Sequence, residues 1–174
     1  TGFTENADHL GRIPQGTVTA DGTLELRLYY DRQVFNIQFI ENGGTSVAEA
    51  TGVRYGQTIS EPEPPTKAGY IFGGWYQDEE FWQPHNFTQP VTADRNLYAR
   101  WIRIQYLVSY EEPDGTLVFP STLMDEGTVV PRPINDPEKE GYTFDDWYLD
   151  AALTQKYAFD QALTGEMVLY ASFK

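Results

Sequence analysis

Apolar and polar residues alternate along several short stretches of the chain. Residues 23–30 carry Leu or Tyr at every second position, and residues 35–39 carry Phe, Ile and Phe in the same way. A period of two is typical of a strand that buries one face. Asp21-Gly22 lies between residues 17–20 and 23–30 and is typical of a hairpin turn, because glycine adopts positive φ at little cost. The pattern therefore predicts a hairpin followed by a half-buried strand.

Four later stretches also have the composition of strands: residues 70–76, 97–101, 142–149 and 168–173. The proline-rich stretches 62–65 and 131–137 predict extended connections, since proline lacks the N–H that a helix or a central strand needs. No segment has a long helical period, and at most a short helix or turn fits near 78–82 and 150–154. We expect small, mostly β units of four or five strands, that is, a mainly β (α+β) fold class.

The chain repeats itself with a shift of 72 residues. Residues 65–101 and 137–173 both read P-x-K-x-G-Y-x-F-x-x-W-Y-x-D, and 15 of the 37 aligned positions are identical. The upstream part aligns with a shift of 71. A solenoid repeat spans about 20–45 residues, whereas these longer units are large enough to close a core of their own. We therefore divide the repeats into domains at 33–102 and 103–174.

Large aromatic residues recur at the same positions of both repeats. A domain of this size is marginally stable, and without disulfides its stability must come from large buried side chains. A ligand site repeated in both copies is the alternative. The expected structural core comprises Tyr70, Phe72, Trp75, Phe87, Tyr142, Phe144, Trp147 and Phe159.

The segment G-Y-I-F-G-G-W-Y-Q-D at 69–78 resembles the Listeria–Bacteroides repeat family, the B-repeats of internalin-like bacterial surface proteins. Asn-Gly-Gly at 42–44, Tyr-Gly at 55–56 and Leu-Tyr-Ala-Arg-Trp at 97–101 also fit its pattern. The second repeat departs from it, with Asp145-Asp146 in place of two glycines. The resemblance implies tandem small β-grasp (ubiquitin-like) domains in an elongated arrangement on a bacterial cell surface.

Residues 1–32 follow a different pattern. Residues 16–22, followed by alternating leucines and Tyr29-Tyr30-Asp31-Arg32, resemble the last hairpin of a mucin-binding-protein-like (MucBP) module. That resemblance implies that residues 1–32 are the C-terminal hairpin of an upstream module, which must lean on the first repeat or be poorly ordered, because so short a segment cannot bury a stable core.

Charge and composition narrow the range of partners. The 174 residues carry a formal net charge of −14 and no cysteine. An acidic chain repels the phosphate backbone, so we expect no nucleic-acid partner. No stretch reaches the roughly 20 apolar residues that a membrane span requires, so we expect no membrane insertion within this segment. Disulfides, thiolate catalysis and cysteine-ligated zinc are excluded.

No arrangement typical of an enzyme is present. The acidic pair Asp145-Asp146 has no counterpart in the first repeat, and we interpret it as solvated turn residues. Asp78 and Asp150 are expected to accept hydrogen bonds from nearby backbone amides, with a calcium site as the alternative. His9 and His85 are isolated in the sequence. We expect no catalytic residue, cofactor or metal.

One local cluster differs between the repeats: Phe81, Trp82 and His85. Trp82 aligns with Thr154 and His85 with Tyr157, so neither aromatic residue is required by the repeat. Exposed aromatic residues anchor ligands and protein contacts. The cluster is a candidate ligand or inter-domain contact, and ordinary surface is the alternative.

The function expected from these features is that of a non-enzymatic segment of a bacterial adhesin. It would act as a semi-rigid stalk or spacer, monomeric, extracellular and anchored to the cell wall through parts outside this sequence. Its partners would be neighbouring domains of the same chain. The alternative is an adhesive module that binds a host glycan of the mucin type or a host protein.

Overall fold

The computed structural model describes residues 2–174, which form strands and loops without a helix. None of the described residues therefore forms a helix that could cross a membrane. The α component of the expected mainly β (α+β) class is absent from this part of the chain: residues 78–82 and 150–154 form turns and bends. The strands are β1 (Phe3–Glu5), β2 (Tyr30–Arg32), β3 (Val34–Ile40), β4 (Ala50–Arg54), β5 (Tyr70–Tyr76), β6 (Arg95–Arg103), β7 (Gln105–Glu111), β8 (Leu117–Asp125), β9 (Phe144–Tyr148) and β10 (Met167–Phe173).

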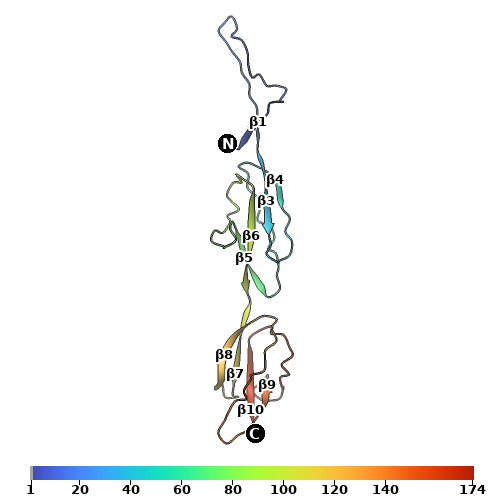
Figure 1. Ribbon diagram of the computed structural model, residues 1–174, viewed down its shortest axis with the longest axis vertical. Helices are drawn as coiled ribbons and strands as arrows, with labels where there is room; N and C mark the ends of the chain where they lie inside the picture. The colour runs from blue at the N-terminus through green and yellow to red at the C-terminus, as the bar shows by residue number, and fades with distance from the viewer. Residues whose placement is uncertain (1) are drawn as a thin grey trace. The chain divides into compact units, whose positions relative to one another are not determined.

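Two four-stranded sheets repeat one topology (Figure 1). The strand order is β4-β3-β6-β5 in the first sheet and β8-β7-β10-β9 in the second. In each sheet the first and last strands of the repeat are parallel neighbours at the centre, and the second strand pairs antiparallel at one edge. This repetition confirms the prediction of a mainly β tandem repeat.

Contacts divide the chain into two units. Unit 1 contains the described residues up to Thr66 together with Phe72–Arg100, and unit 2 contains Lys67–Ile71 and Trp101–Lys174. The short segment 67–71 belongs to unit 2 because the backbone N–H of Ile104 donates to the carbonyl of Gly69 at 2.9 Å. The ammonium group of Lys67 also lies 5.7 Å from the centre of the Trp101 ring.

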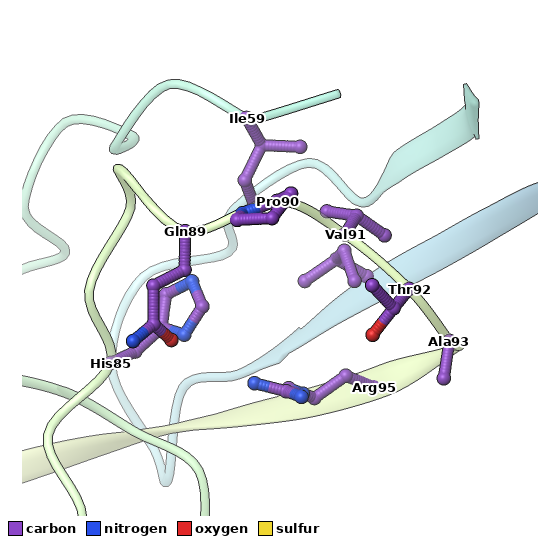
Figure 2. Close-up of a pocket in the computed structure, with 9 residues that line it drawn as sticks. Ile59, His85, Gln89, Pro90, Val91, Thr92, Ala93 and Arg95 are labelled. Atoms are coloured by element: carbon purple, nitrogen blue, oxygen red, sulfur yellow. The ribbon is translucent and has the colours of Figure 1, made fainter. Parts of the chain in front are cut away.

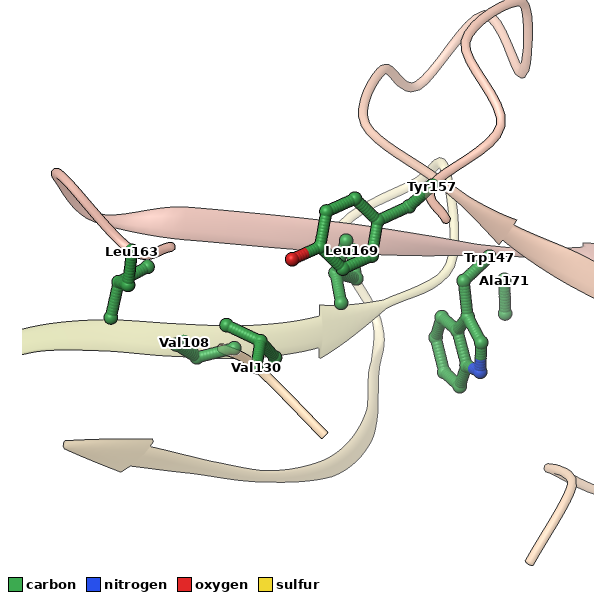
Figure 3. Close-up of a cluster of buried hydrophobic side chains, with 7 residues drawn as sticks. All are labelled: Val108, Val130, Trp147, Tyr157, Leu163, Leu169 and Ala171. Carbon is green, nitrogen blue, oxygen red and sulfur yellow. The ribbon is translucent and has the colours of Figure 1, made fainter. Parts of the chain in front are cut away.

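Unit 2 has a continuous buried core, which Figure 3 shows. Trp147 is fully buried there, and its ring centre lies 5.1 Å from that of Tyr110 and 5.4 Å from that of Phe144. The buried cluster consists of Val108, Val130, Trp147, Tyr157, Leu163, Leu169 and Ala171.

Trp75 occupies the equivalent place in unit 1. It is 2% exposed, and its ring centre lies 4.8 Å from that of Phe39 and 5.4 Å from that of Phe72. Most of the other aromatic residues expected in the cores are half-buried, and Phe72 and Phe144 contact these tryptophans. The half-buried set is Tyr70, Phe72, Phe87, Phe144 and Phe159.

The expectation that Tyr142 belongs to the core is wrong, because its side chain is 58% exposed. Tyr142 follows Gly141, which has a φ of 81°, and lies in the turn before β9 begins at Phe144. Its backbone N–H donates to the carbonyl of Lys139, and the Lys139 ammonium lies 5.4 Å from its ring centre. The turn thus holds this ring on the surface beside a cation.

The predicted strand over residues 23–30 is also wrong for most of its length. The turn at Asp21-Gly22 forms, with the N–H of Thr19 donating to the carbonyl of Thr23. Between this turn and the β1–β2 pair, an isolated bridge joins Ile13 to Arg27, and the N–H of Asn6 donates to the carbonyl of Tyr29. No other layer of the described chain covers the alternating side chains. Each is about half exposed: Leu24, Leu26, Leu28 and Tyr30.

Gly2 attaches the N-terminal segment to unit 1. Gly2 is buried, has a φ of 82°, and its carbonyl accepts a hydrogen bond from the N–H of Gln33. A Cβ atom at this position would lie 2.4 Å from ring carbons of Tyr55. The absence of a side chain at Gly2 is therefore required for this attachment.

We expect Gly2→Ala to detach β1 from unit 1 and to raise the hydrogen-exchange rate of the Gln33 amide by about tenfold or more, since alanine adds both a clash and positive-φ strain. Gly22→Ala is the matched control, because Gly22 has a φ of 85° but nothing within 4 Å of the added carbon. Equal effects of the two substitutions on Gln33 would show that the close approach to Tyr55 does not matter.

Candidate functional site

A loop after β5 presents Trp82 to solvent. The carboxylate of Asp78 accepts hydrogen bonds from the backbone N–H groups of Trp82 and Gln83, both at 2.8 Å. Phe81 has a φ of 59°, and its ring centre lies 5.6 Å from that of Tyr76. Trp82 itself is 81% exposed. The loop is therefore held at its base while its largest side chain remains outside the core.

Unit 2 builds the same loop without the tryptophan. Asp150 accepts hydrogen bonds from the backbone N–H groups of Thr154 and Gln155 at 3.1 and 2.7 Å. The pKa of Asp150 is lowered below its ordinary value, and the hydrogen bond from the Thr154 amide is the largest cause. Leu153 has a φ of 56°, like Phe81. The prediction that both aspartates bond to nearby amides is confirmed.

Asp78→Ala removes the acceptor for two backbone amides. We expect the exchange rates of the Trp82 and Gln83 amides to rise about tenfold or more, since each lost bond was to a charged group. Asp150→Ala is the matched control and should accelerate only Thr154 and Gln155. Unchanged exchange at Trp82 in Asp78→Ala would mean that other contacts fix this loop.

His85 lies beside a cavity in unit 1 rather than beside Trp82. Its backbone N–H donates to the carbonyl of Trp75 at 2.8 Å, and its ring centre lies 4.6 Å from that of Phe87. Both ring nitrogens are shielded from solvent and have no hydrogen-bond partner among residues 2–174. Burial, together with the positive charge of Arg95, lowers the pKa of His85 below its ordinary value. The imidazole is therefore neutral at pH 7.

The cavity has a volume of about 280 Å³ (Figure 2). The Arg95 side chain extends along its wall toward the imidazole of His85. The guanidinium of Arg95 donates to the side-chain oxygen of Gln77 and forms no ion pair with any carboxylate of the described chain. The rest of the lining is mixed: Gln89 and Thr92 are polar, whereas Ile37, Ile59 and Val91 are among the apolar side chains.

The structure does not bring the predicted cluster together as one patch. Trp82 is displayed on its loop, Phe81 packs on Tyr76, and only His85 lines the cavity. Sequence reasoning missed Arg95, although a signal was present: the second repeat has Met167 at the aligned position. Arginine in place of methionine at one central strand position marks a difference in environment between the repeats.

The interpretation of Asp145-Asp146 as solvated turn residues is wrong, because both lie in β9, where Asp145 is half-buried and pairs with Lys174. Asp146 lies in β9, is 7% exposed, and forms ion pairs with Arg132 at 2.7 Å and with Lys156. Burial opposes its ionisation, but hydrogen bonds from Lys156, the Trp147 amide and Arg132 outweigh it and hold the pKa below its ordinary value. The carboxylate is an ionised structural group, which is unsuited to the role of a general acid.

No group of three or more His, Asp or Glu side chains is placed to hold a metal ion within residues 2–174. The candidate features of the described chain are thus the exposed Trp82 loop and the cavity at His85.

Comparison with known proteins identifies the repeated unit. The sequence model of the Listeria-Bacteroides repeat domain matches residues 35–100 and 106–172. A "Putative Gly-rich membrane protein" of Evansella cellulosilytica is 36% identical over 179 aligned residues, which cover 100% of this chain and 20% of that protein. A "Putative membrane protein" of the same organism is 37% identical, covering 90% of this chain and 23% of that protein.

Internalin H of Listeria monocytogenes is 32% identical over 121 residues, covering 67% of this chain and 21% of that protein. The chain thus spans between a fifth and a quarter of the length of these relatives. Residues 2–32 lie outside both family matches, and their resemblance to a MucBP hairpin stays a prediction. Through two tandem copies that cover most of its length, the chain belongs to the Listeria-Bacteroides repeat family.

Proposed function

We propose that this chain is a non-enzymatic repeat segment of a bacterial cell-surface adhesin, acting as a semi-rigid stalk or spacer that presents other domains. The observation that carries the proposal is the duplication of one small sheet around an aromatic core in each copy. Both copies use the tryptophan for packing, as Trp75 and Trp147 are buried. Repetition of a self-contained unit adds length to a chain without adding a reaction centre.

The connection between the repeats favours stiffness. Strand β6 ends at Arg103 and β7 begins at Gln105, so Ile104 alone separates them. Flexible linkers are rich in glycine and serine. A connection of one residue that is neither glycine nor serine supports the role of a spacer.

The proposed location is extracellular, on a cell wall to which parts outside this sequence attach the protein. The names of the relatives, which include an internalin and two membrane proteins, support this location. The net charge of −14 favours solubility on a crowded surface. The proposed partners are neighbouring domains of the same chain, and the segment itself is monomeric.

Small-angle X-ray scattering of the chain tests the spacer role. We expect a radius of gyration well above the ~16 Å of a compact body of this length. Replacing Ile104 by a Gly-Ser-Gly-Gly-Ser segment should broaden the distribution of interatomic distances, since the connection becomes a random coil. A radius near the compact value, unchanged by the insertion, would contradict a stiff spacer.

An adhesive module for a host mucin-type glycan or a host protein is the second candidate, favoured by the 81% exposure of Trp82. Exposed tryptophan is enriched among residues that dominate binding energy. If the chain is such a module, we expect the wild-type chain to bind on a glycan and matrix-protein array. The Trp82→Thr chain, which carries the residue of the second repeat, should lose that binding. Ile134→Ala, at a position 101% exposed in unit 2, is the control. Absence of binding by the wild-type chain would contradict the adhesive module, and the spacer role would be the remaining candidate.

A further inference from the structure

The backbone beside the cavity at His85 has an equivalent in unit 2. In unit 1 the N–H of His85 donates to the carbonyl of Trp75 at 2.8 Å, and in unit 2 the N–H of Tyr157 donates to the carbonyl of Trp147 at 2.9 Å. The backbone therefore places His85 and Tyr157 at the same point of the two folds.

A second pair of lining positions is fixed in the same way. The N–H of Val91 donates to the carbonyl of Gln57 at 2.7 Å, and the N–H of Leu163 donates to the carbonyl of Thr128 at 2.8 Å. Val91 and Leu163 thus enter the two cores from equivalent backbone positions, although leucine is larger by one methylene.

The central strands supply the third pair. Arg95 in β6 is the register partner of Ile37 in β3, and Met167 in β10 is the register partner of Val108 in β7. Equivalent strand positions therefore carry a cation in unit 1 and an apolar thioether in unit 2.

The same frame encloses a space in one unit and a packed core in the other. In unit 2, Tyr157 is 2% exposed, and Val130 and Leu163 are fully buried. In unit 1, the equivalent positions carry His85 and Val91, which line a cavity of about 280 Å³. Protein cores are normally packed to the density of organic crystals. The two units therefore differ in side chains and packing at a point where these backbone hydrogen bonds are the same.

The chemistry of the lining is that of a site for an anion with an apolar part. The Arg95 guanidinium donates to Gln77 and has no carboxylate partner in residues 2–174. Ile37, Ile59 and Val91 form an apolar wall. An arginine binds a carboxylate, and such a wall binds a compact hydrocarbon group.

Size supports an organic ligand over a single water molecule. One water needs about 10–15 Å³ of space for its centre, whereas small-molecule pockets span roughly 300–1,000 Å³. At about 280 Å³, the cavity lies at the lower end of the ligand range.

We propose that unit 1 contains a binding site, absent from unit 2, for a small carboxylate with a compact apolar body, held by Arg95 and His85. The carboxylate accepts hydrogen bonds from the Arg95 guanidinium, and the apolar body lies against Ile59, Val91 and the His85 ring. The proposal does not depend on the spacer role, because a ligand in one repeat changes neither the number nor the length of the repeats.

Benzoate is the probe, since it combines a carboxylate with a flat six-membered ring. Titrated into the isotope-labelled chain and followed by nuclear magnetic resonance at about 0.1 M salt, benzoate should shift the amides of residues 85–95 and saturate at or below millimolar concentration. Benzamide, which has the same shape without the charge, should bind at least about tenfold more weakly than benzoate. Unit 2 signals should stay unshifted and serve as the internal control.

Variants that install residues of unit 2 sharpen the test. Arg95→Met should weaken benzoate binding by about tenfold or more by removing the cation, and His85→Tyr should abolish it by filling the cavity. Arg100→Met is the matched control, since it makes the same change of charge at an exposed position outside the cavity. It should leave benzoate binding unchanged.

Three outcomes would overturn the proposal: no saturable shift of residues 85–95 by benzoate, equal binding of benzoate and benzamide, or full binding by a folded Arg95→Met chain. The comparison of benzoate with benzamide uses only the wild-type chain, so the proposal is tested even if a variant does not fold. Binding here together with a compact scattering profile would uphold the site and contradict the spacer.

Discussion

Trp147→Ala is expected to lower the free energy of unfolding of unit 2 by about 3–5 kcal/mol. The indole is fully buried and its ring packs against Tyr110, Phe119 and Phe144. Alanine would leave a cavity in the core. A unit this small buries little other surface that could offset the loss. Calorimetry should show the melting temperature of this unit lowered by about 12 °C or more.

Two further tryptophans make this prediction specific. Trp75→Ala should destabilise unit 1 by a similar amount, since Trp75 is 2% exposed. Trp82→Ala should change stability by less than about 0.5 kcal/mol, because Trp82 is 81% exposed. If Trp147→Ala melted at the same temperature as Trp82→Ala, the aromatic core would not be what stabilises the repeat.

Asp146→Ala should have the next largest effect, about 1–3 kcal/mol on the unfolding of unit 2. The substitution removes the carboxylate that pairs with Arg132 and Lys156 and that accepts from the Trp147 amide at 2.9 Å. Both cations are about half exposed and regain water, so the loss falls short of that for a fully buried pair. Denaturant unfolding at pH 7 measures it.

The same residue predicts a dependence on pH. The pKa of Asp146 is lower in the folded chain than the ~3.9 of an unfolded aspartate. Its contribution to stability is therefore complete above pH ~4 and is lost as the pH falls through the folded pKa. As the pH falls through this range, the free energy of unfolding of the Asp146→Asn chain should decrease less than that of the wild type. The chain with the exposed substitution Asp136→Asn should show the same decrease as the wild type. Identical acid curves for all three chains would contradict the ion-pair account.

Alternation of apolar residues predicted one strand correctly and another incorrectly for a physical reason. In β3 the alternation buries Ile37 and Phe39 because β4 and β6 flank the strand and a core lies beneath it. The stretch 24–30 alternates just as clearly but remains exposed. Periodicity shows which face of a segment can be buried, but not whether the fold supplies a layer to cover it.

The sequence pattern predicted neither β4 nor β8, and β8 contains Pro120, a residue that argues against a central strand. The sheet order places β8 at an edge, where a missing N–H costs no ladder hydrogen bond. Tyr142 was predicted to lie in the core because Tyr70 is the identical residue of the other repeat. Identity at an aligned position does not determine whether a side chain is buried. The turn before β9 leaves it exposed.

The candidate site was only partly visible in the sequence. A comparison of the repeats pointed to His85, since Tyr157 replaces it. The cavity itself also needs Ile37, Ile59 and Arg95, which come from separate segments of the chain, and Ile37 meets Arg95 through the parallel pairing of β3 with β6. Long-range packing of this kind is not encoded in any local pattern.

Residue-resolved hydrogen exchange on the intact chain in low denaturant tests the central claim, that each repeat is stabilised by its own core. We predict that the amides of unit 1 and unit 2 report two separate opening free energies, and that Trp147→Ala lowers only that of unit 2. One opening free energy shared by all protected amides, lowered throughout by Trp147→Ala, would contradict the claim.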